Sequence, residues 1–231
     1  MCGRYSLIAD LGELARRFEF DGDWDAFERR YNIAPTQNVL TVVGGESRRG
    51  GYMRWGLKPS WAKDKSMGSR MINARAETVV EKPSFGNALR RRRCLFLADG
   101  FYEWQKVGKQ RIPMRIVMRS SEPFAFAGLW ETWRDPQGDV NPSCTIITTS
   151  ANDTLSPIHN RMPVILPHDL EAFWLDDSVT DPEVLTSVLT PYDDGAMEAY
   201  EVSTLVNSAR NDGSEVMERV GYEGKENAYV L

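Results

Sequence analysis

Cysteine and histidine are the scarcest chemically reactive residues of this sequence. The three cysteines, Cys2, Cys94 and Cys144, have no spacing typical of a disulfide framework, so we expect reduced thiols and a cytoplasmic protein. Neither His159 nor His168 lies at zinc-ligand spacing from a cysteine, and no CxxC motif is present. We therefore expect neither a metal nor a cofactor.

Long apolar runs are also missing. No stretch reaches about 18 apolar residues, so no membrane span is expected. The N-terminus lacks a basic stretch followed by an apolar one, which argues against a secretory signal. No internal repeat or long linker divides the 231 residues, and 42% of them are hydrophobic. We expect one domain over 1–221, a loose tail over 222–231, and a monomer.

Basic residues are concentrated in the middle of an acidic chain. The net charge is −5, yet residues 48–119 carry 18 Lys and Arg against 5 Asp and Glu, a net charge of +13. Residues 120–231 carry 5 against 20, a net charge of −15. The basic block could bind a polyanion such as nucleic acid, or it could pair with the acidic part of the same chain.

Strand patterns outnumber helical ones. Apolar periodicity predicts a helix over 10–20 with Asp10 as N-cap, and shorter helices over 169–175 and 182–189. Runs rich in Val, Ile, Phe and Thr predict strands over 38–43, 52–55, 93–98, 111–118, 124–130 and 143–149. This pattern predicts an α+β domain on a curved, mostly antiparallel sheet or open β-barrel, flanked by short helices.

The second residue, Cys2, has the most specific chemistry. If Met1 is removed, Cys2 carries both an α-amine and a thiol, whose ordinary pKa values are about 8 and about 8.5. Such a 1,2-aminothiol traps aldehydes, because the amine forms a Schiff base and the thiolate then closes a thiazolidine ring. The alternative is a buried thiol that is at position 2 by chance.

Two further residues are candidates for proton transfer. Glu103 lies in DGFYEW between two aromatic residues, and an apolar setting would raise its pKa towards 7. His159 follows Pro157 and is expected on a turn or loop, where imidazole can act as an acid or base. The alternatives are a strand glutamate that faces solvent and a hydrogen-bonded structural histidine.

The segment INARAE (72–77) predicts a strand with polar residues on one side. Asn73 and Arg75 alternate along it and would share a face. Arg75 could pair with a phosphate, and Asn73 could hold an amine or a carbonyl. The alternative for Arg75 is an ion pair with Glu77.

Eight segments together resemble the SRAP family of SOS-response-associated peptidases, also known as abasic-site processing proteins. They are MCGRY at the start, RYNIAPTQ (30–37), WGLKPSW (55–61), INARAET (72–78), CLFLADGFYEW (94–104), TTSAN (148–152), IHNRMPVIL (158–166) and VSTLVN (202–207). Their order and spacing match the family, whose fold is a single open-barrel α+β domain. The region 62–71 looks variable, so the resemblance does not define the stacking residues there.

The resemblance implies a role for each matching residue. Cys2 would crosslink to the aldehyde of an abasic site, Asn73 would orient the reacting groups, Glu103 would act as general acid and base, and His159 would protonate the sugar ring oxygen. The implied DNA contacts are Arg4 and Arg75 on phosphates, Pro35 and Trp61 along the DNA path, Thr148 on the DNA backbone or the site wall, and Arg161.

The resemblance therefore implies a DNA damage protein of the SOS response that forms a covalent crosslink with abasic sites in single-stranded DNA. A modest lyase activity through the Schiff base would accompany the crosslink. Two alternatives use the same sequence. One is a cysteine peptidase that removes its own Met1 with Cys2 as nucleophile. The other is a non-covalent single-stranded DNA-binding module in which Cys2 is incidental.

Overall fold

The computed structural model describes residues 2–22, 27–62 and 65–221. Met1, residues 63–64 of the variable region and the expected loose tail over 222–231 lie outside the described residues. In the described part of the chain, no helix is long and apolar enough to span a membrane.

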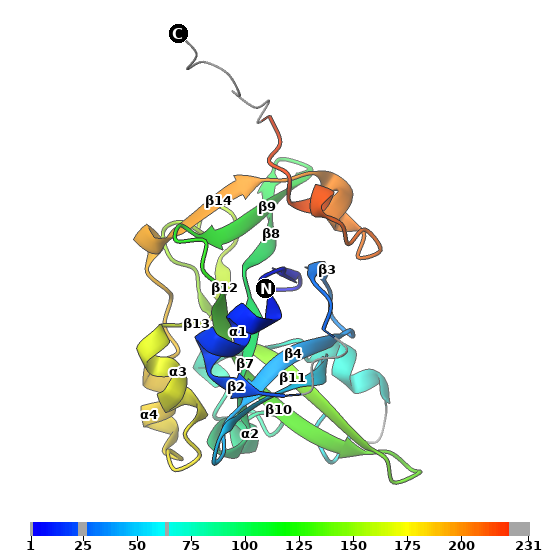
Figure 1. Cartoon of the computed structure of the whole chain (residues 1–231), viewed down its shortest axis with the longest axis vertical. Helices are drawn as coiled ribbons and strands as arrows, with labels where there is room; N and C mark the ends of the chain where they lie inside the picture. The colour runs from blue at the N-terminus through cyan, green and yellow to red at the C-terminus, as the bar shows by residue number, and fades with distance from the viewer. Residues whose placement is uncertain (1, 23–26, 63–64, 222–231) are drawn as a thin grey trace.

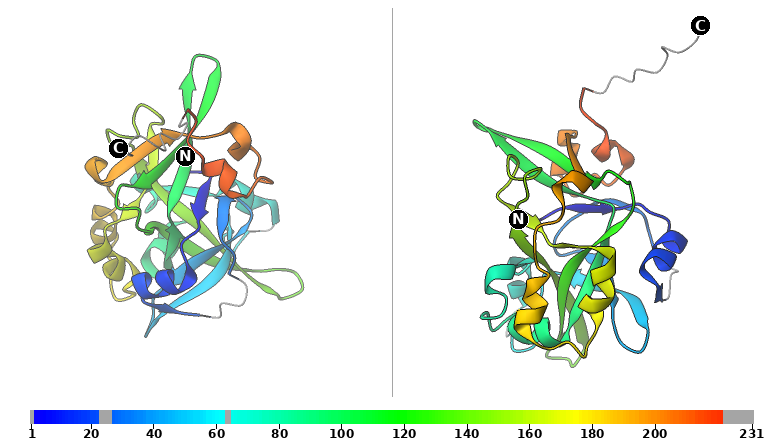
Figure 2. Two further views of the ribbon diagram at one scale, coloured as in Figure 1. Left: turned by 45° about the horizontal axis from the view of Figure 1, so that its top comes forward. Right: turned by 90° about the vertical axis from the view of Figure 1, so that its left-hand side faces the viewer.

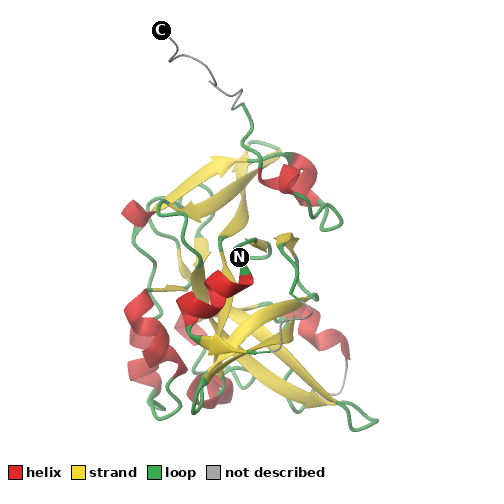
Figure 3. Cartoon of the chain, viewed as in Figure 1, coloured by secondary structure: helices red, strands yellow, loops and turns green. Residues whose placement is uncertain are grey.

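Two β-sheets form the body of the protein (Figures 1 and 3). The five-stranded sheet is antiparallel, with the order β14 (Met197–Glu201), β9 (Gln110–Met118), β8 (Gly100–Val107), β1 (Tyr5–Leu7) and β3 (Arg30–Ile33). The nine-stranded sheet comprises β12 (Arg161–Pro163), β11 (Val140–Ser150), β10 (Phe124–Arg134), β7 (Arg93–Ala98), β4 (Asn38–Val43), β5 (Arg48–Trp55) and β2 (Phe20–Asp21), with β13 (Ile165–Leu166) beside β10 and β6 (Asn73–Arg75) beside β11.

The larger sheet closes on itself. Strands β11, β10, β7, β4 and β5 follow one another, and a short parallel pairing of Cys144 with Trp55 joins β11 back to β5. The expected curved and mostly antiparallel sheet is confirmed, and this pairing completes a five-stranded barrel. The core inside is rich in aromatic side chains: Tyr5 contacts Trp55 and Phe126 edge to face, at centroid distances of 5.4 Å and 5.9 Å.

Short helices flank the sheets, as expected. They are α1 (Leu11–Phe18), α2 (Gly86–Arg91), α3 (His168–Leu175) and α4 (Pro182–Ser187), with 3-10 turns at Lys65–Arg70, Ala76–Thr78, Asp194–Ala196, Thr204–Asn207 and Ser214–Met217. The Asp10 carboxylate accepts the Gly12 N–H, which confirms the predicted N-cap of α1. Glu19 adopts a left-handed conformation with φ 52°, and α1 therefore ends at Phe18, before the predicted boundary.

The basic run 90–93 is largely structural. Arg93 is buried, and its guanidinium donates to backbone carbonyls including those of Leu89 and Trp174. Arg92 pairs with Glu131 at 2.6 Å. Part of the +13 block therefore pairs within the chain, as one of the two charge interpretations predicted.

A C-terminal segment, residues 203–221, lies across β3, and a buried asparagine of β3 contributes several of the hydrogen bonds that hold it. Asn32 Nδ2 donates to the carbonyls of Val206, Ser208 and Asn211 at 3.2, 3.0 and 2.7 Å. Its Oδ1 accepts from Arg4 Nη1 at 2.8 Å. We call residues 203–221 the C-terminal strap. Asn32 therefore connects the strap to the N-terminal arm of the chain.

Asn32→Ala should lower the free energy of unfolding by about 3 kcal/mol, because it removes three hydrogen bonds from the buried Asn32 amide to strap carbonyls and one of the two acceptors of Arg4 Nη1. For a chain of this size that corresponds to a melting temperature lower by roughly 6–12 °C, measured by thermal denaturation. Asn38→Ala, at an exposed asparagine, is the matched control and should change stability by no more than about 0.5 kcal/mol. Equal effects of the two substitutions would show that Asn32 does not hold the strap.

Candidate active site

Three elements meet at Cys2, namely strands β1, β6 and β8, whose arrangement Figure 1 shows. Strand β1 pairs with β8 through Tyr5 and Phe101, and the Tyr102 N–H donates to the Arg4 carbonyl at 2.9 Å, which carries the N-terminal arm along β8 towards Glu103. From β6, Asn73 Nδ2 donates to the Cys2 carbonyl at 2.8 Å. Residues far apart in sequence are thus brought to one place.

Glu103 lies almost fully buried on β8, with 4% of its surface exposed. Burial disfavours the carboxylate and raises the pKa of Glu103 to about 7. The carboxyl can therefore both give and take a proton at neutral pH. The alternative of a solvent-facing strand glutamate is wrong, although the residue does belong to a strand.

The Cys2 thiol is fully buried. Burial raises the pKa of this thiol far above its ordinary range, and the negative charge of Glu103 raises it further. The thiol is therefore protonated at neutral pH in this arrangement, and it needs a base before it can act as a nucleophile.

His159 lies on a loop, as predicted, after the turn that ends at Ile158. Its Nδ1 lies 3.0 Å from the backbone nitrogen of Arg161 and 3.2 Å from the carbonyl oxygen of the same residue, so it can accept from one or donate to the other, depending on the tautomer. Partial burial lowers the pKa of His159 below its ordinary value. Gln105 Nε2 donates to the Pro157 carbonyl at 3.2 Å, which ties this loop to β8 two residues beyond Glu103.

Asn73 has one amide atom in use and one without a partner. Its Oδ1 is buried, and no donor for it lies within hydrogen-bond reach among the described residues. A buried acceptor without a donor is costly, so the position favours a ligand that brings an N–H or O–H group. The strand predicted along INARAE (72–77) is confirmed as β6, although it is shorter than predicted, because a 3-10 turn begins at Ala76.

The predicted DNA contacts fall into two groups, of which the first is accessible. Trp61 is 56% exposed, Arg75 is exposed and Pro35 is partly exposed. The alternative ion pair between Arg75 and Glu77 is not formed. Glu77 pairs with Arg161 instead, at 2.5 and 3.0 Å, and the hydrogen bond lowers the pKa of Glu77.

The second group is engaged within the protein. Arg4 Nη1 donates to Asn32 and to the Val206 carbonyl, and Arg161 Nη2 donates to the Thr148 carbonyl at 2.6 Å. Thr148 is fully buried, so it can form the wall of the site but cannot itself reach a DNA phosphate in this arrangement. Both arginines must change partners before they can bind a phosphate.

Some of the residues that shape the site gave no signal in the sequence. Asn32 donates to backbone carbonyls 174 to 179 residues away in the sequence, and Gln105 donates to one that is 52 residues away. A single polar residue in a strand carries no motif that would reveal such a partner. Asn207, which accepts from Trp104 Nε1 at 2.7 Å, lies in the VSTLVN segment that the resemblance included. That segment was therefore the sequence feature that could have indicated a contact between the strap and β8 next to Glu103.

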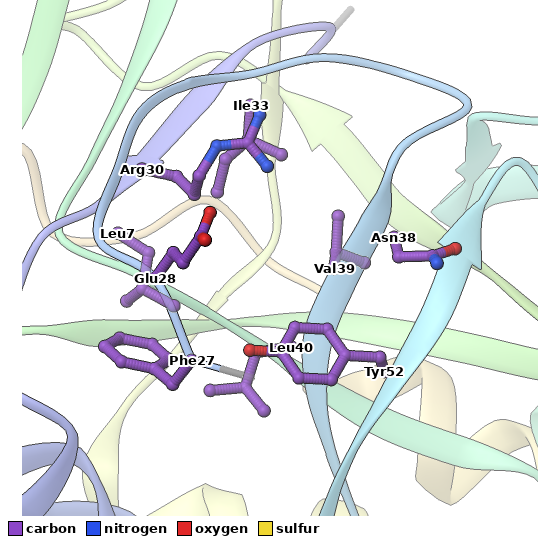
Figure 4. Close-up of a pocket in the computed structure, with 9 residues that line it drawn as sticks. All are labelled: Leu7, Phe27, Glu28, Arg30, Ile33, Asn38, Val39, Leu40 and Tyr52. Atoms are coloured by element: carbon purple, nitrogen blue, oxygen red, sulfur yellow. The ribbon is translucent and has the colours of Figure 1, made fainter. Parts of the chain in front are cut away.

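A cavity of about 330 Å³ lies elsewhere on the molecule (Figure 4). It is lined by Leu7, Phe27, Glu28, Arg30, Ile33, Asn38, Val39, Leu40 and Tyr52. Its lining includes none of Cys2, Asn73, Glu103 and His159. Cys2 and Glu103 are almost inaccessible to solvent, so the candidate site is closed in this arrangement.

Comparison with known proteins places these residues in context. A family model described as SOS response associated peptidase (SRAP) matches residues 1–209. The chain is 49% identical over 222 residues to abasic site processing protein YoqW of Bacillus subtilis, covering 94% of this chain and 99% of that protein. It is 31% identical over 230 residues to abasic site processing protein HMCES of Xenopus tropicalis, covering 85% and 68%.

A solved structure agrees with the fold. The crystal structure of a protein from Bacteroides thetaiotaomicron superposes with a TM-score of 0.87 at 26% sequence identity, covering 94% of this chain and 99% of that one.

Proposed function

Because the chain belongs to the SOS response associated peptidase (SRAP) family, we propose that it recognises abasic sites in single-stranded DNA and bonds Cys2 covalently to the opened sugar. The relatives named above are called abasic site processing proteins, which supports this substrate. The observation that carries the proposal is the convergence of Cys2, Asn73 and the buried Glu103. The reaction requires removal of Met1, which frees the α-amine.

The first chemical step opens the sugar. A protonated His159 can donate its Nε2 proton to the ring oxygen as the bond from C1′ to that oxygen breaks, and the neutral imidazole then takes the proton of the C1′ hydroxyl, which gives the aldehyde. An abasic sugar is easily turned out of the strand, because no base has to be unstacked. The lesion is therefore favoured over intact DNA.

The second step forms two bonds to the same carbon. The Cys2 amine adds to C1′, and loss of water gives a Schiff base. Sγ then adds to C1′, and the thiol proton passes to the nitrogen, which closes the thiazolidine. Glu103, with a pKa of about 7, can relay the protons of both events. Holding amine, thiol and aldehyde together contributes most of the rate gain.

The same Schiff base permits a side reaction. Removal of a C2′ proton by β-elimination would cut the strand on the 3′ side of the lesion. Because ring closure by Sγ consumes the Schiff base, we expect strand cleavage to remain a minor product.

A denaturing gel tests the proposal directly. Protein incubated with an abasic single-stranded oligonucleotide should give a slower band that survives denaturation, and an oligonucleotide with intact bases should give none. Intact-mass spectrometry should find the adduct at the sum of both masses less one water, on a chain that lacks Met1. A complex that binds but dissociates on denaturation would instead indicate a non-covalent DNA-binding module.

The family description favours a second candidate, a peptidase that removes Met1. Cys2 directly follows the bond to be cut, and Glu103 and His159 are the acid–base partners of the proposed site. If the chain removes its own Met1, the Glu103→Gln variant should retain Met1 when it is expressed. If a cellular aminopeptidase removes Met1 instead, the variant should lack Met1 just as the parent does. A panel of unrelated peptides separates self-processing from a general peptidase.

Arg75→Gln should weaken non-covalent binding to single-stranded DNA, because Arg75 is exposed and is proposed to hold a phosphate. The slope of log affinity against log salt should become shallower by about 0.7, the value for one phosphate contact on a single strand. Fluorescence anisotropy over a salt series measures it. Arg91→Gln, at an exposed arginine of α2, is the control and should leave the slope unchanged.

A further inference from the structure

The β8–β9 hairpin projects from the body of the protein as a narrow ribbon (Figure 2). At its base, β1 pairs with β8 at Gly100 and Phe101, and the pairing of β14 with β9 ends at Met114. Backbone bonds to other segments continue only as far as Tyr102, which donates to the Arg4 carbonyl, and Pro113, which accepts from Val202. Over 105–112, among the described residues, the backbones of the two strands pair only with each other. We call residues 105–112 the basic ribbon.

The charge of the basic ribbon is of one sign. Lys106, Lys109 and Arg111 are exposed, and no acidic residue lies between Trp104 and Pro113 in the sequence. None of these three cations forms an ion pair with another residue that the structure describes. The ribbon therefore presents three available cations close to the turn of one hairpin.

The arrangement works against the stability of the hairpin. Lys106 lies directly opposite Arg111 in the strand register, and like charges in that position destabilise a sheet. The hairpin between β10 and β11 offers a contrast, because its tip places Arg134 beside Asp135 and Asp139. A polyanion bound to the basic ribbon would relieve the repulsion between Lys106 and Arg111.

The ribbon is also attached to the active site. Glu103 and Gln105 belong to the same strand, and Gln105 Nε2 donates to Pro157 of the loop that carries His159. Val107, near the tip, lies four positions beyond Glu103 on the strand, a distance of about 13 Å. A DNA strand leaving the lesion towards this side would therefore come within reach of the ribbon.

We propose that the basic ribbon is a further DNA contact, in which Lys106, Lys109 and Arg111 bind phosphates of the strand that flanks the abasic site. This inference rests on the proposed function, because it extends the DNA footprint outward from Glu103. Nothing in the ribbon suggests that these three cations contact base edges, so phosphates are the DNA groups that they fit best. Phosphate contacts position DNA without reading its sequence.

The test compares two oligonucleotides on the full chain, in which the lesion has either one nucleotide or ten nucleotides on each side. The triple substitution Lys106→Gln, Lys109→Gln and Arg111→Gln should make the salt slope for the long oligonucleotide shallower by about 2, from three lost contacts of about 0.7 each. When the salt concentration is raised from 50 to 200 mM, the DNA affinity of the variant should then fall by a factor roughly 16 times smaller than that of the parent. Binding of the short oligonucleotide and the final yield of adduct at saturating DNA should not change.

Arg134→Gln, on the other hairpin, is the matched control and should leave both slopes unchanged. The single variant Lys109→Gln, at the turn, should shift the long-oligonucleotide slope by about 0.7 even if the triple variant folds poorly. Unchanged slopes with intact crosslinking would overturn the ribbon inference and leave the proposed function standing. Variants that aggregate but keep the DNA affinity of the parent would overturn the ribbon inference as well. Absence of any adduct with the parent chain would instead refute the proposed function.

Discussion

Cys2→Ala should reduce the denaturation-resistant adduct with abasic DNA to the level of a protein-free blank. Without Sγ no carbon–sulfur bond can form, and the remaining Schiff base hydrolyses when the complex is denatured. A denaturing gel of the time course, with and without borohydride, measures this. Borohydride should restore a band in the variant, because it reduces the Schiff base that the free amine still forms.

The other buried cysteines provide the control for Cys2. Cys94 and Cys144 are as inaccessible as Cys2, so their replacement by alanine removes a comparable volume from the core. Both variants should lose some stability, about 1 kcal/mol, yet form the adduct at the rate of the parent. A stable adduct in Cys2→Ala without borohydride would place the nucleophile elsewhere.

Glu103→Gln should slow adduct formation by about 10²–10⁴-fold, the contribution typical of a general acid–base group. The parent rate should change through a transition near pH 7, because the pKa of Glu103 is raised to about 7, and the variant should lack that transition. Single-turnover rates from pH 5 to 9 measure both effects. Glu131→Gln, at a nearly buried strand glutamate that pairs with Arg92, is the control and should keep the parent profile.

The same substitution should change the pH dependence of stability. The pKa of Glu103 lies near 7 in the folded state against 4.5 ordinarily, so between these values the folded chain binds a proton that the unfolded chain has lost. The free energy of unfolding therefore falls as the pH rises through this window, by about 3 kcal/mol in total. Thermal denaturation at pH 5 and pH 8 should show a smaller loss in Glu103→Gln than in the parent. Equal losses would mean that the carboxyl ionises normally in the folded chain.

Local sequence patterns predicted the elements that carry their own signals. Strands over 38–43 and 93–98 begin and end at the predicted residues, because continuous apolar runs bounded by turns define them. The strand predicted over 52–55 begins earlier, at Arg48, since the polar and glycine-rich start of β5 is held by its pairing with β4. Strand β8 was not predicted, although it carries Glu103.

The sequence allowed the residues of the candidate site to be predicted, but it did not allow their arrangement in space to be predicted. The apolar neighbours of Glu103 anticipated its raised pKa, because burial alone is the main cause. No local pattern could show that Arg161 pairs with Glu77, 84 residues away, or that Arg4 donates to Val206, 202 residues away. Such pairings depend on the closure of the sheets and on the path of the C-terminal strap.

The bond from Arg4 to Val206 also bears on how the protein is made. Asn32 and Arg4 acquire their carbonyl partners only when residues 206–211 have been synthesised. A nascent chain would therefore hold Arg4 and Asn32 without these partners, so the N-terminal arm can reach its final arrangement only after synthesis has passed the strap.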